Sequence, residues 1–253
     1  MKKTMLLLWL CLPIIGFCQI ENSLIKGTSP LSTGLWSQNS NISGLADVKY
    51  KAIGVLHKNF FSIAELSQSS IVFASPIKYG AIGLNFNYSG DDLYNTKDVG
   101  FTFAKSFDDK LLLGFKSNYQ NTNLNNVFYH SLGFELGSIF SFNQKTDLAF
   151  HLKNTISQSE RTIISLAFGY HFSKKLDGII FLQKDGGTPL SINSQINYYL
   201  LPTLDLSVVS SNKLDNNKFG ISYLFTNWTL DSFISYHSYL GFTTQLGFSY
   251  RWK

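Results

Sequence analysis

The sequence predicts an all-β fold, a transmembrane antiparallel β-barrel of about fourteen strands, with twelve as the fallback. Three observations support this fold. Large apolar residues alternate with small polar ones through most of the chain, and the joints between these segments alternate between short and long. Beyond the N-terminus, no apolar run reaches the ~18 residues that a membrane-spanning helix needs, so any span must consist of strands. Successive strand side chains point to opposite faces, and one aromatic face with one polar face is typical of an outer-membrane barrel.

The first 18 residues have the composition of a secretory signal peptide. Lys2 and Lys3 precede an apolar run over residues 5–15, and a stretch of small residues ends near Cys18. A retained membrane anchor is the alternative, but the run is short of ~18 residues. Cys11 and Cys18 are the only cysteines. After cleavage near Cys18, the mature chain would therefore have neither a disulfide nor thiol chemistry.

The composition also favours a membrane location. Aromatic residues make up 15% of the chain and charged residues another 15%, well below the ~25% charged residues of a typical soluble domain. The net charge of +5 includes Lys2 and Lys3, and without them 19 basic residues face 16 acidic ones, a balance of +3. That charge is too mild and too evenly spread to indicate nucleic acid. We expect export to the cell outer membrane of a Gram-negative cell, with outer-membrane lipid as the first partner.

The chain divides into three parts. Residues 1–18 form the signal peptide. Residues 19–46 are rich in Ser, Asn and Gly without a clear period, and they are long enough to plug or line the periplasmic mouth. Residues 47–253 form the barrel. The expected strands span residues 47–57, 67–75, 78–88, 97–107, 110–120, 130–142, 145–153, 161–173, 176–184, 190–200, 203–210, 217–226, 228–237 and 241–252.

The joints give independent support, because outer-membrane barrels have short turns at one rim and longer loops at the other. Short joints are expected at 76–77, 108–109, 143–144, 174–175, 201–202 and 226–227. Longer polar joints are expected at 58–66, 89–96, 121–129, 154–160, 185–189, 211–216 and 238–240. Each proline of the mature chain is expected in a joint or in the leader segment, since proline removes a hydrogen-bond donor from a strand: Pro30, Pro76, Pro189 and Pro202.

The two faces of the barrel follow from the alternation. We expect the lipid face to include Phe101, Phe103, Phe168, Tyr223 and Phe248, and the inner face to include Gly100, Thr102, Gly169, Ser222 and Gly247. The inner face should also carry a few charged or titratable residues, paired or hydrated: Lys116, Glu135, His151, Asp205, Asp231 and Arg251. With about fourteen strands, a lumen would be wider than that of an eight-stranded barrel and narrower than a porin channel.

The last strand, residues 242–252, has the clearest alternation. Phe248, Tyr250 and Trp252 lie on one face, with small or polar residues between them. This aromatic C-terminal strand resembles the segment by which the barrel-assembly machinery recognises its clients. The terminal aromatic is displaced by one position, because Lys253 follows Trp252.

A short motif before the first strand gives a family resemblance. Asn41-Ile42-Ser43-Gly44-Leu45 resembles the Asn-Pro-Ala-Gly-Leu motif that precedes the barrel in the long-chain fatty-acid transporter (FadL-like) superfamily. The related PorV/PorQ-type proteins of the type IX secretion system carry the same motif. Asn41, Gly44 and Leu45 match it, whereas Ile42 and Ser43 replace its proline and alanine, and the loops are shorter than in those families. Residues 79–88 and 109–114 are also similar to these families, but the N-terminal motif of the rival PorP/SprF-type proteins is not found here.

The resemblance implies a fourteen-stranded barrel with an N-terminal segment ahead of it, and two functional classes. One is a non-enzymatic scaffold in a type IX-like assembly that binds secretion-system components or secreted cargo. The other is a FadL-like transporter or passive channel for hydrophobic small molecules. A blocked lumen with an unbroken wall would favour the scaffold, and a kinked strand opening onto an apolar pocket would favour the transporter.

Catalytic and metal-binding patterns are missing from the sequence. The histidines lie on separate segments without metal-ligand spacing, and no serine sits in a nucleophile motif: His57, His130, His151, His171 and His237. We therefore expect no cofactor and no enzymatic activity. A membrane enzyme remains the third class, and a Ser–His contact at the outer leaflet would support it.

Overall fold

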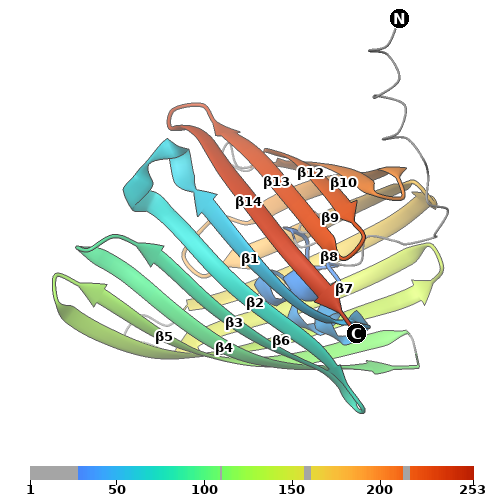
Figure 1. Ribbon diagram of the computed structural model, residues 1–253, viewed down its shortest axis with the longest axis horizontal. Helices are drawn as coiled ribbons and strands as arrows, with labels where there is room; N and C mark the ends of the chain where they lie inside the picture. The colour runs from blue at the N-terminus through green and yellow to red at the C-terminus, as the bar shows by residue number, and fades with distance from the viewer. Residues whose placement is uncertain (1–27, 109, 157–160, 213–216) are drawn as a thin grey trace, which may run out of the picture.

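The computed structural model describes residues 28–253 except 109, 157–160 and 213–216. Its architecture is a closed antiparallel barrel of fourteen strands, each paired with the next along the chain, and β1 pairs with β14 to close the ring (Figure 1). The predicted fold class and strand number are both confirmed. The predicted signal peptide and residues 19–27 lie outside the described residues. No helix in the described part of the chain is long and apolar enough to cross a membrane.

The strands are β1 (Lys51–Asn59), β2 (Ser67–Ile77), β3 (Gly80–Gly90), β4 (Tyr94–Phe107), β5 (Leu111–Leu124), β6 (Val127–Asn143), β7 (Thr146–Ile156), β8 (Arg161–Ser173), β9 (Leu176–Asp185), β10 (Ser191–Leu201), β11 (Leu204–Ser211), β12 (Lys218–Phe225), β13 (Trp228–His237) and β14 (Gly241–Trp252). Four short 3₁₀ helices accompany them: η3 (Leu35–Asn39), η4 (Ile42–Asp47), η5 (Phe60–Ser62) and η6 (Ala64–Leu66).

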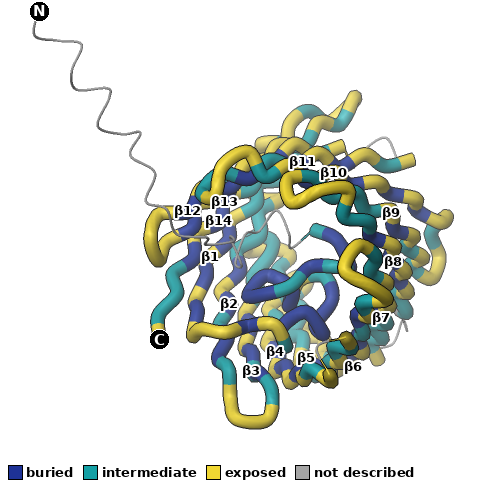
Figure 2. The backbone as a smooth tube through the Cα atoms, turned by 90° about the vertical axis from the view of Figure 1, so that its right-hand side faces the viewer, coloured by how far each residue is buried: buried dark blue, intermediate teal, exposed yellow. Residues whose placement is uncertain are grey.

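The two faces of the wall differ as the alternation predicts. Phe101 and Phe168 on the outer face are about half exposed, whereas Thr102 and Ser222 on the inner face are fully buried. Large apolar side chains dominate the outer surface and small or polar ones the inner surface, so buried and exposed residues alternate along each strand (Figure 2). An outer surface so rich in exposed apolar side chains fits a lipid environment.

The two rims have different connections, which define two ends of the barrel. At the turn end, strands are joined by tight turns such as residues 144–145 and 174–175; at the loop end, the connections include the longer segments 60–66 and 186–190. The predicted loops at 89–96 and 121–129 are wrong. β4 begins at Tyr94, and β5 joins β6 through a turn at Asn125 and Asn126, which both have positive φ. The alternation is reversed there: outward positions carry polar residues such as Asn121 and Asn123, and inward positions carry apolar ones such as Leu124 and Tyr129, so the pattern no longer resembles the rest of the wall.

Two boundaries also differ from prediction. β1 begins at Lys51 rather than at residue 47, because residues up to Asp47 belong to η4. Pro76 was expected in a joint but lies one residue before the end of β2, where it pairs with Ala81. A proline is tolerated at a strand end, where the missing donor costs least.

Residues 28–48, hereafter the inner segment, lie inside the barrel. η3 and η4 pack mainly against β1–β6 in the half of the barrel near the turn end. Figure 2 shows these dark-blue turns within the ring of strands, nearer to the wall of β2–β6 than to the opposite wall.

Candidate functional site

The inner segment folds on itself around the motif residue Gly44. A Cβ atom at Gly44 would lie only 1.8 Å from the carbonyl oxygen of Ser32, so no other residue fits without moving the backbone. The Gly44 carbonyl oxygen accepts a hydrogen bond from the amide of Gly34 at 3.0 Å. This close crossing joins the two halves of the segment.

Asn41 joins the inner segment to the barrel wall. Its side-chain amide donates to the carbonyl oxygens of Pro30 at 2.8 Å and Ser138 at 3.2 Å, and the Phe150 oxygen lies at 3.4 Å. Its carbonyl oxygen accepts from the Ser43 hydroxyl at 2.8 Å and from the Ser43 amide, which caps η4. Asn41 is fully buried. Every hydrogen-bonding atom of this side chain therefore has a partner, and two of its acceptors belong to the wall.

Glycines of the inner face provide the room for this segment. A Cβ atom added at any of these positions would lie within 2.1–2.7 Å of an atom of the inner segment, well inside van der Waals contact: Gly54 against Trp36, Gly83 against Gln38, Gly114 against Ser43, Gly137 against Asn41 and Gly169 against Leu31. We call these five positions the glycine socket. They come from β1, β3, β5, β6 and β8. The small inner face is thus shaped to one particular segment.

Apolar contacts complete the docking. Leu35, Trp36 and Leu45 of the inner segment are fully buried. They share one cluster with small apolar residues of the wall, including Ala52, Val72, Ala74, Ala81 and Ala104. Burying side chains of this size contributes roughly 1.5–3 kcal/mol each. The motif residue Leu45 therefore contributes to packing.

A buried ionic cluster lies next to the inner segment, and Glu135 is at its centre. One carboxylate oxygen accepts from Asn118 at 2.7 Å and lies 3.2 Å from the Lys153 ammonium and 3.6 Å from that of Lys116. The other oxygen lies 3.1 Å from Nε2 of His151. Lys116 and Glu135 are each only 4% exposed. A carboxylate can be kept ionised in such a place because cations and donors surround it.

Lys116 connects this cluster to the inner segment. Its ammonium donates to the backbone carbonyl oxygen of Gln38 at 3.1 Å. Gln38 in turn donates through Nε2 to the Phe73 carbonyl oxygen of β2 at 3.0 Å. The end of η3 is thus held from two sides of the wall.

The other predicted lumen residues are not part of this cluster. Asp205 and Asp231 are buried on the opposite wall, on β11 and β13, and Asp231 accepts a hydrogen bond from Ser222. Arg251 lies at the turn end of β14, where its guanidinium donates to the Thr226 carbonyl oxygen at 3.1 Å and sits 5.8 Å from the Tyr50 ring. The structure therefore brings Lys116, Glu135 and His151 together and leaves these three elsewhere.

A second charged group, at the turn end, was not predicted. His171 places Nδ1 2.7 Å from Asp177 and Nε2 2.8 Å from Asp147, and Tyr199 donates its hydroxyl to Asp177. Carboxylates only accept, so the ring donates through both nitrogens and is an imidazolium. The sequence signal was weak, because these residues come together only through the pairing of β7–β10.

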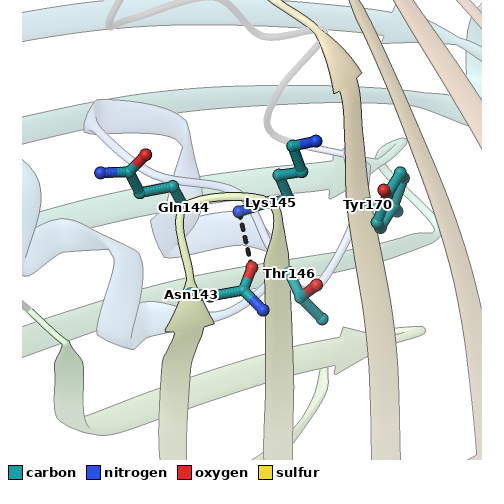
Figure 3. Close-up of a pocket in the computed structure, with 5 residues that line it drawn as sticks. All are labelled: Asn143, Gln144, Lys145, Thr146 and Tyr170. Atoms are coloured by element: carbon teal, nitrogen blue, oxygen red, sulfur yellow. Dashed lines mark hydrogen bonds between the residues drawn. The ribbon is translucent and has the colours of Figure 1, made fainter.

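Nearby, the β6–β7 turn forms a shallow surface hollow lined by Asn143, Gln144, Lys145, Thr146 and Tyr170 (Figure 3). The Lys145 amide donates to the Asn143 side chain at 2.8 Å, which closes the turn. Figure 3 shows these side chains spread around the hollow without converging on one point. The hollow has no features of a ligand site.

One Ser–His contact does occur on the outer face. Nδ1 of His57 lies 3.1 Å from the hydroxyl of Ser69, across the β1–β2 pair. In the described residues, no hydrogen bond orients Nε2 of His57. The β1 and β2 backbones are paired here, so they offer no free N–H groups to an oxyanion. The contact therefore lacks two of the parts that nucleophilic catalysis requires.

The C-terminal strand forms an aromatic band where the barrel closes. Phe248 stacks on Trp228 with ring centroids 4.7 Å apart, and Tyr250 stacks on Trp252 at 5.7 Å. Trp252 pairs with Lys51, the first residue of β1. Aromatic residues therefore line the closing seam at the turn end.

The wall is continuous in the described part of the chain. Every neighbouring pair of strands is hydrogen-bonded, and the register shifts lie near the turn end, at 141–143, 171–173 and 199–201. Among the described strands, no register shift lies at mid-height of the wall.

Comparison with known proteins identifies the fold. No protein-family model and no curated protein matches the chain. Among solved structures, a Pseudomonas aeruginosa FadL homologue superposes with a TM-score of 0.62 at 10% identity, over 88% of this chain and 95% of that one. The P. putida toluene transporter TodX gives 0.58 at 9% identity, over 87% and 94%. The Acinetobacter baumannii outer membrane protein Omp33 gives 0.53 at 8% identity, over 80% and 98%. The chain is therefore a closed fourteen-stranded antiparallel barrel of the outer-membrane type, with the inner segment folded inside.

Proposed function

We propose that this barrel is a non-enzymatic scaffold of the outer membrane that binds partner proteins in a type IX-like secretion assembly. The observation that carries the proposal is the occupied interior. The inner segment fits the glycine socket, and Asn41 and Gln38 bond directly to the wall. A barrel whose turn-end half holds its own segment, with an unbroken wall among the described residues, is suited to act through its exposed surfaces.

The proposal includes an orientation. The turn end faces the periplasm and the loop end faces outward, as in outer-membrane barrels generally. Residues 1–18 direct export, and the outer face contacts lipid. The barrel-assembly machinery recognises the C-terminal strand, which carries Phe248, Tyr250 and Trp252. Asn41, Gly44 and Leu45 serve to close the periplasmic half by holding the inner segment.

The second candidate is a FadL-like transporter or passive channel for hydrophobic small molecules. Two of the similar structures are a FadL homologue and a toluene transporter. In favour of this candidate, η3 and η4 pack mainly on one side of the wall. Against it, many interior-facing residues of the opposite wall are polar, among them Asn193, Gln195, Asn197 and Ser207, although Phe181, Val209, Leu224 and Phe233 add apolar patches. A hydrophobic solute would therefore meet a mixed polar and apolar lining there, without a continuous apolar pocket among the described residues.

An enzyme is the weakest candidate. His57 and Ser69 are in contact, but they have neither an orienting group in the described residues nor oxyanion donors. We expect Ser69→Ala to leave every phenotype of the wild-type strain unchanged.

A deletion strain separates the two main candidates. If the scaffold proposal holds, deletion lowers the secretion or surface attachment of particular proteins, while uptake of hydrophobic compounds such as toluene stays at the parental rate. Normal secretion with a specific loss of uptake would refute the scaffold role and support the transporter. Complementation with Ser69→Ala tests the enzyme in the same strain.

A further inference from the structure

The turn end of the barrel carries a large excess of positive charge. Among the described residues, the exposed charged side chains of its turns, of the strand ends beside them and of the chain on either side of the closing seam are nine lysines and two aspartates: Lys49, Lys51, Lys78, Lys105, Lys110, Lys145, Lys174, Lys175 and Lys253 against Asp47 and Asp108. By sequence, Asp109 adds one negative charge, which leaves an excess of six. Asp147 and Asp177 face the lumen and bond to His171, so they are not part of this exposed rim. The nine lysines are hereafter the basic arc.

The loop end has no such excess. Its exposed charged side chains in the described residues are two lysines and two acids, Lys97 and Lys184 against Glu65 and Asp92. By sequence, the segments 157–161 and 213–216 add two basic and two acidic residues, which also balance. The positive charge is therefore a property of one rim and does not reflect a general need of exposed turns for charge.

The lysines begin where the apolar band of the outer face ends. On β4, Phe103 faces lipid, and Lys105 and Phe107 follow it on the same face. The Lys105 ammonium lies 4.8 Å from the centroid of the Phe107 ring, so its aliphatic stem follows the wall and its charge is directed toward the turn end. The Lys78 ammonium lies in the same way 5.2 Å from the centroid of the Tyr79 ring. Aromatic rings at the edge of an apolar band mark the boundary between hydrocarbon and headgroups, so these ammonium groups lie at headgroup depth.

The same order of residues recurs around the rim. An exposed aromatic residue at the end of an outer face precedes a turn that contains lysine: Phe107 before Lys110, Phe142 before Lys145, and Phe172 before Lys174 and Lys175. At the closing seam, Lys51 pairs with Trp252, and Lys253 follows it. The turns at 202–203 and 226–227 contain no lysine. The basic arc therefore follows the rim from β14 through β1 to β9 and leaves out the turns of β10–β13.

We propose that the basic arc binds the phosphate groups of anionic phospholipids in the leaflet around the turn end. The position favours lipid as the partner, because the arc directly continues the lipid-facing band and is drawn out along the rim. An acidic protein would be matched better by charges gathered on one compact face. Each lysine near an anionic membrane surface strengthens the attraction, by roughly fivefold in affinity. The proposal concerns the lipid around the barrel, so it goes beyond the scaffold function and does not rest on it.

The test measures which phospholipid gathers at the closing seam, where Trp228 and Trp252 lie on the outer face. The full-length barrel, with Trp9 replaced by Phe, is placed in nanodiscs of phosphatidylcholine. These contain a small fraction of either brominated phosphatidylglycerol or brominated phosphatidylcholine, and bromine quenches tryptophan on contact. Trp36 is fully buried inside the barrel and gives a constant background. We expect phosphatidylglycerol to associate with the seam at least about fivefold more strongly than phosphatidylcholine.

Variants of the barrel locate the preference. Lys51→Gln combined with Lys253→Gln removes the lysines at the seam and should lower the preference to less than about twofold. Lys97→Gln combined with Lys184→Gln removes two exposed lysines from the loop end and should leave the preference unchanged. All four side chains are exposed, and heat-modifiable migration in gels checks that both variants fold. Added salt should weaken the preference in the wild-type barrel, because exposed charges are screened.

Four results would overturn the proposal. Equal quenching by the two brominated lipids would show that the rim does not select anionic lipid. An equal loss in the loop-end variant would show that net charge, and not the arc, sets the preference. Displacement by millimolar inorganic phosphate would identify a free anion as the ligand. Binding of labelled polyglutamate to the barrel in nanodiscs of neutral lipid, lost in the variant of Lys51 and Lys253, would identify an acidic protein as the partner.

Discussion

Gly137→Ala tests whether the glycine socket holds the inner segment. The new methyl carbon would lie 2.1 Å from the side-chain oxygen of Asn41. Asn41 cannot simply turn away, because its amide group is bonded to carbonyl oxygens of Pro30 and Ser138. Either the wall shifts or these hydrogen bonds break. At about 1 kcal/mol for each bond, with the cost of overpacking added, we expect docking to weaken by about 3 kcal/mol.

That loss corresponds to roughly a hundredfold in the docked-to-undocked ratio. The fluorescence of fully buried Trp36 measures this loss once Trp9, Trp228 and Trp252 are replaced by Phe. In wild-type protein, iodide should not quench Trp36, whereas in Gly137→Ala quenching should rise. The control is Gly133→Ala on the same face of β6, where the nearest atom to the new carbon is 3.3 Å away. Equal quenching in the two variants, with both barrels folded, would refute the reasoning.

Further predictions concern charge and depth. Phe101→Lys places a charge on the lipid face and should cost ~2–4 kcal/mol of folding free energy in liposomes, whereas Phe128→Lys, at the loop end of β6, should cost ~1 kcal/mol or less; equal costs would contradict a lipid-facing band that ends below Phe128. Glu135→Gln leaves the buried Lys116 ammonium without its carboxylate and should lower the free energy of unfolding in urea by about 3 kcal/mol, and Lys116→Met in the same chain should restore part of it. His171→Gln breaks ion pairs of a half-exposed ring and should cost no more than about 1 kcal/mol, less still at high salt; a loss as large as that of Glu135→Gln would show that exposure does not decide these costs.

The period-two alternation predicts this fold well because lipid imposes it on every strand. It fails at the ends of β4, β5 and β6, where outward positions carry polar residues such as Asn121 and Asn123, which suit a strand and a loop equally. The pattern also identifies inward positions such as Lys116, Glu135 and His151. It does not give their contacts, because the convergence on Glu135 depends on the exact register of β5, β6 and β7.

The sequence alone could not identify the glycine socket, for a related reason. Gly114, Gly133 and Gly137 all occupy inward positions, but only Gly114 and Gly137 meet the inner segment. A glycine needed for close approach and one in an open space look alike in a sequence. The motif resemblance singled out Asn41 and Gly44, and the structure shows the contacts that these residues make.

The position of the socket along the chain has a consequence for the order of assembly. All five of its glycines lie on β1–β8, and every strand of that half pairs with its neighbour in sequence. Pairing between sequence neighbours forms early, because it closes only short loops. The surface that receives the inner segment is thus complete before β14 must find β1, the most distant pairing in the molecule. We expect the half-sheet of β1–β8 to bind the inner segment first and the barrel to close around it afterwards. The segment would then be enclosed during folding, rather than inserted into a finished barrel.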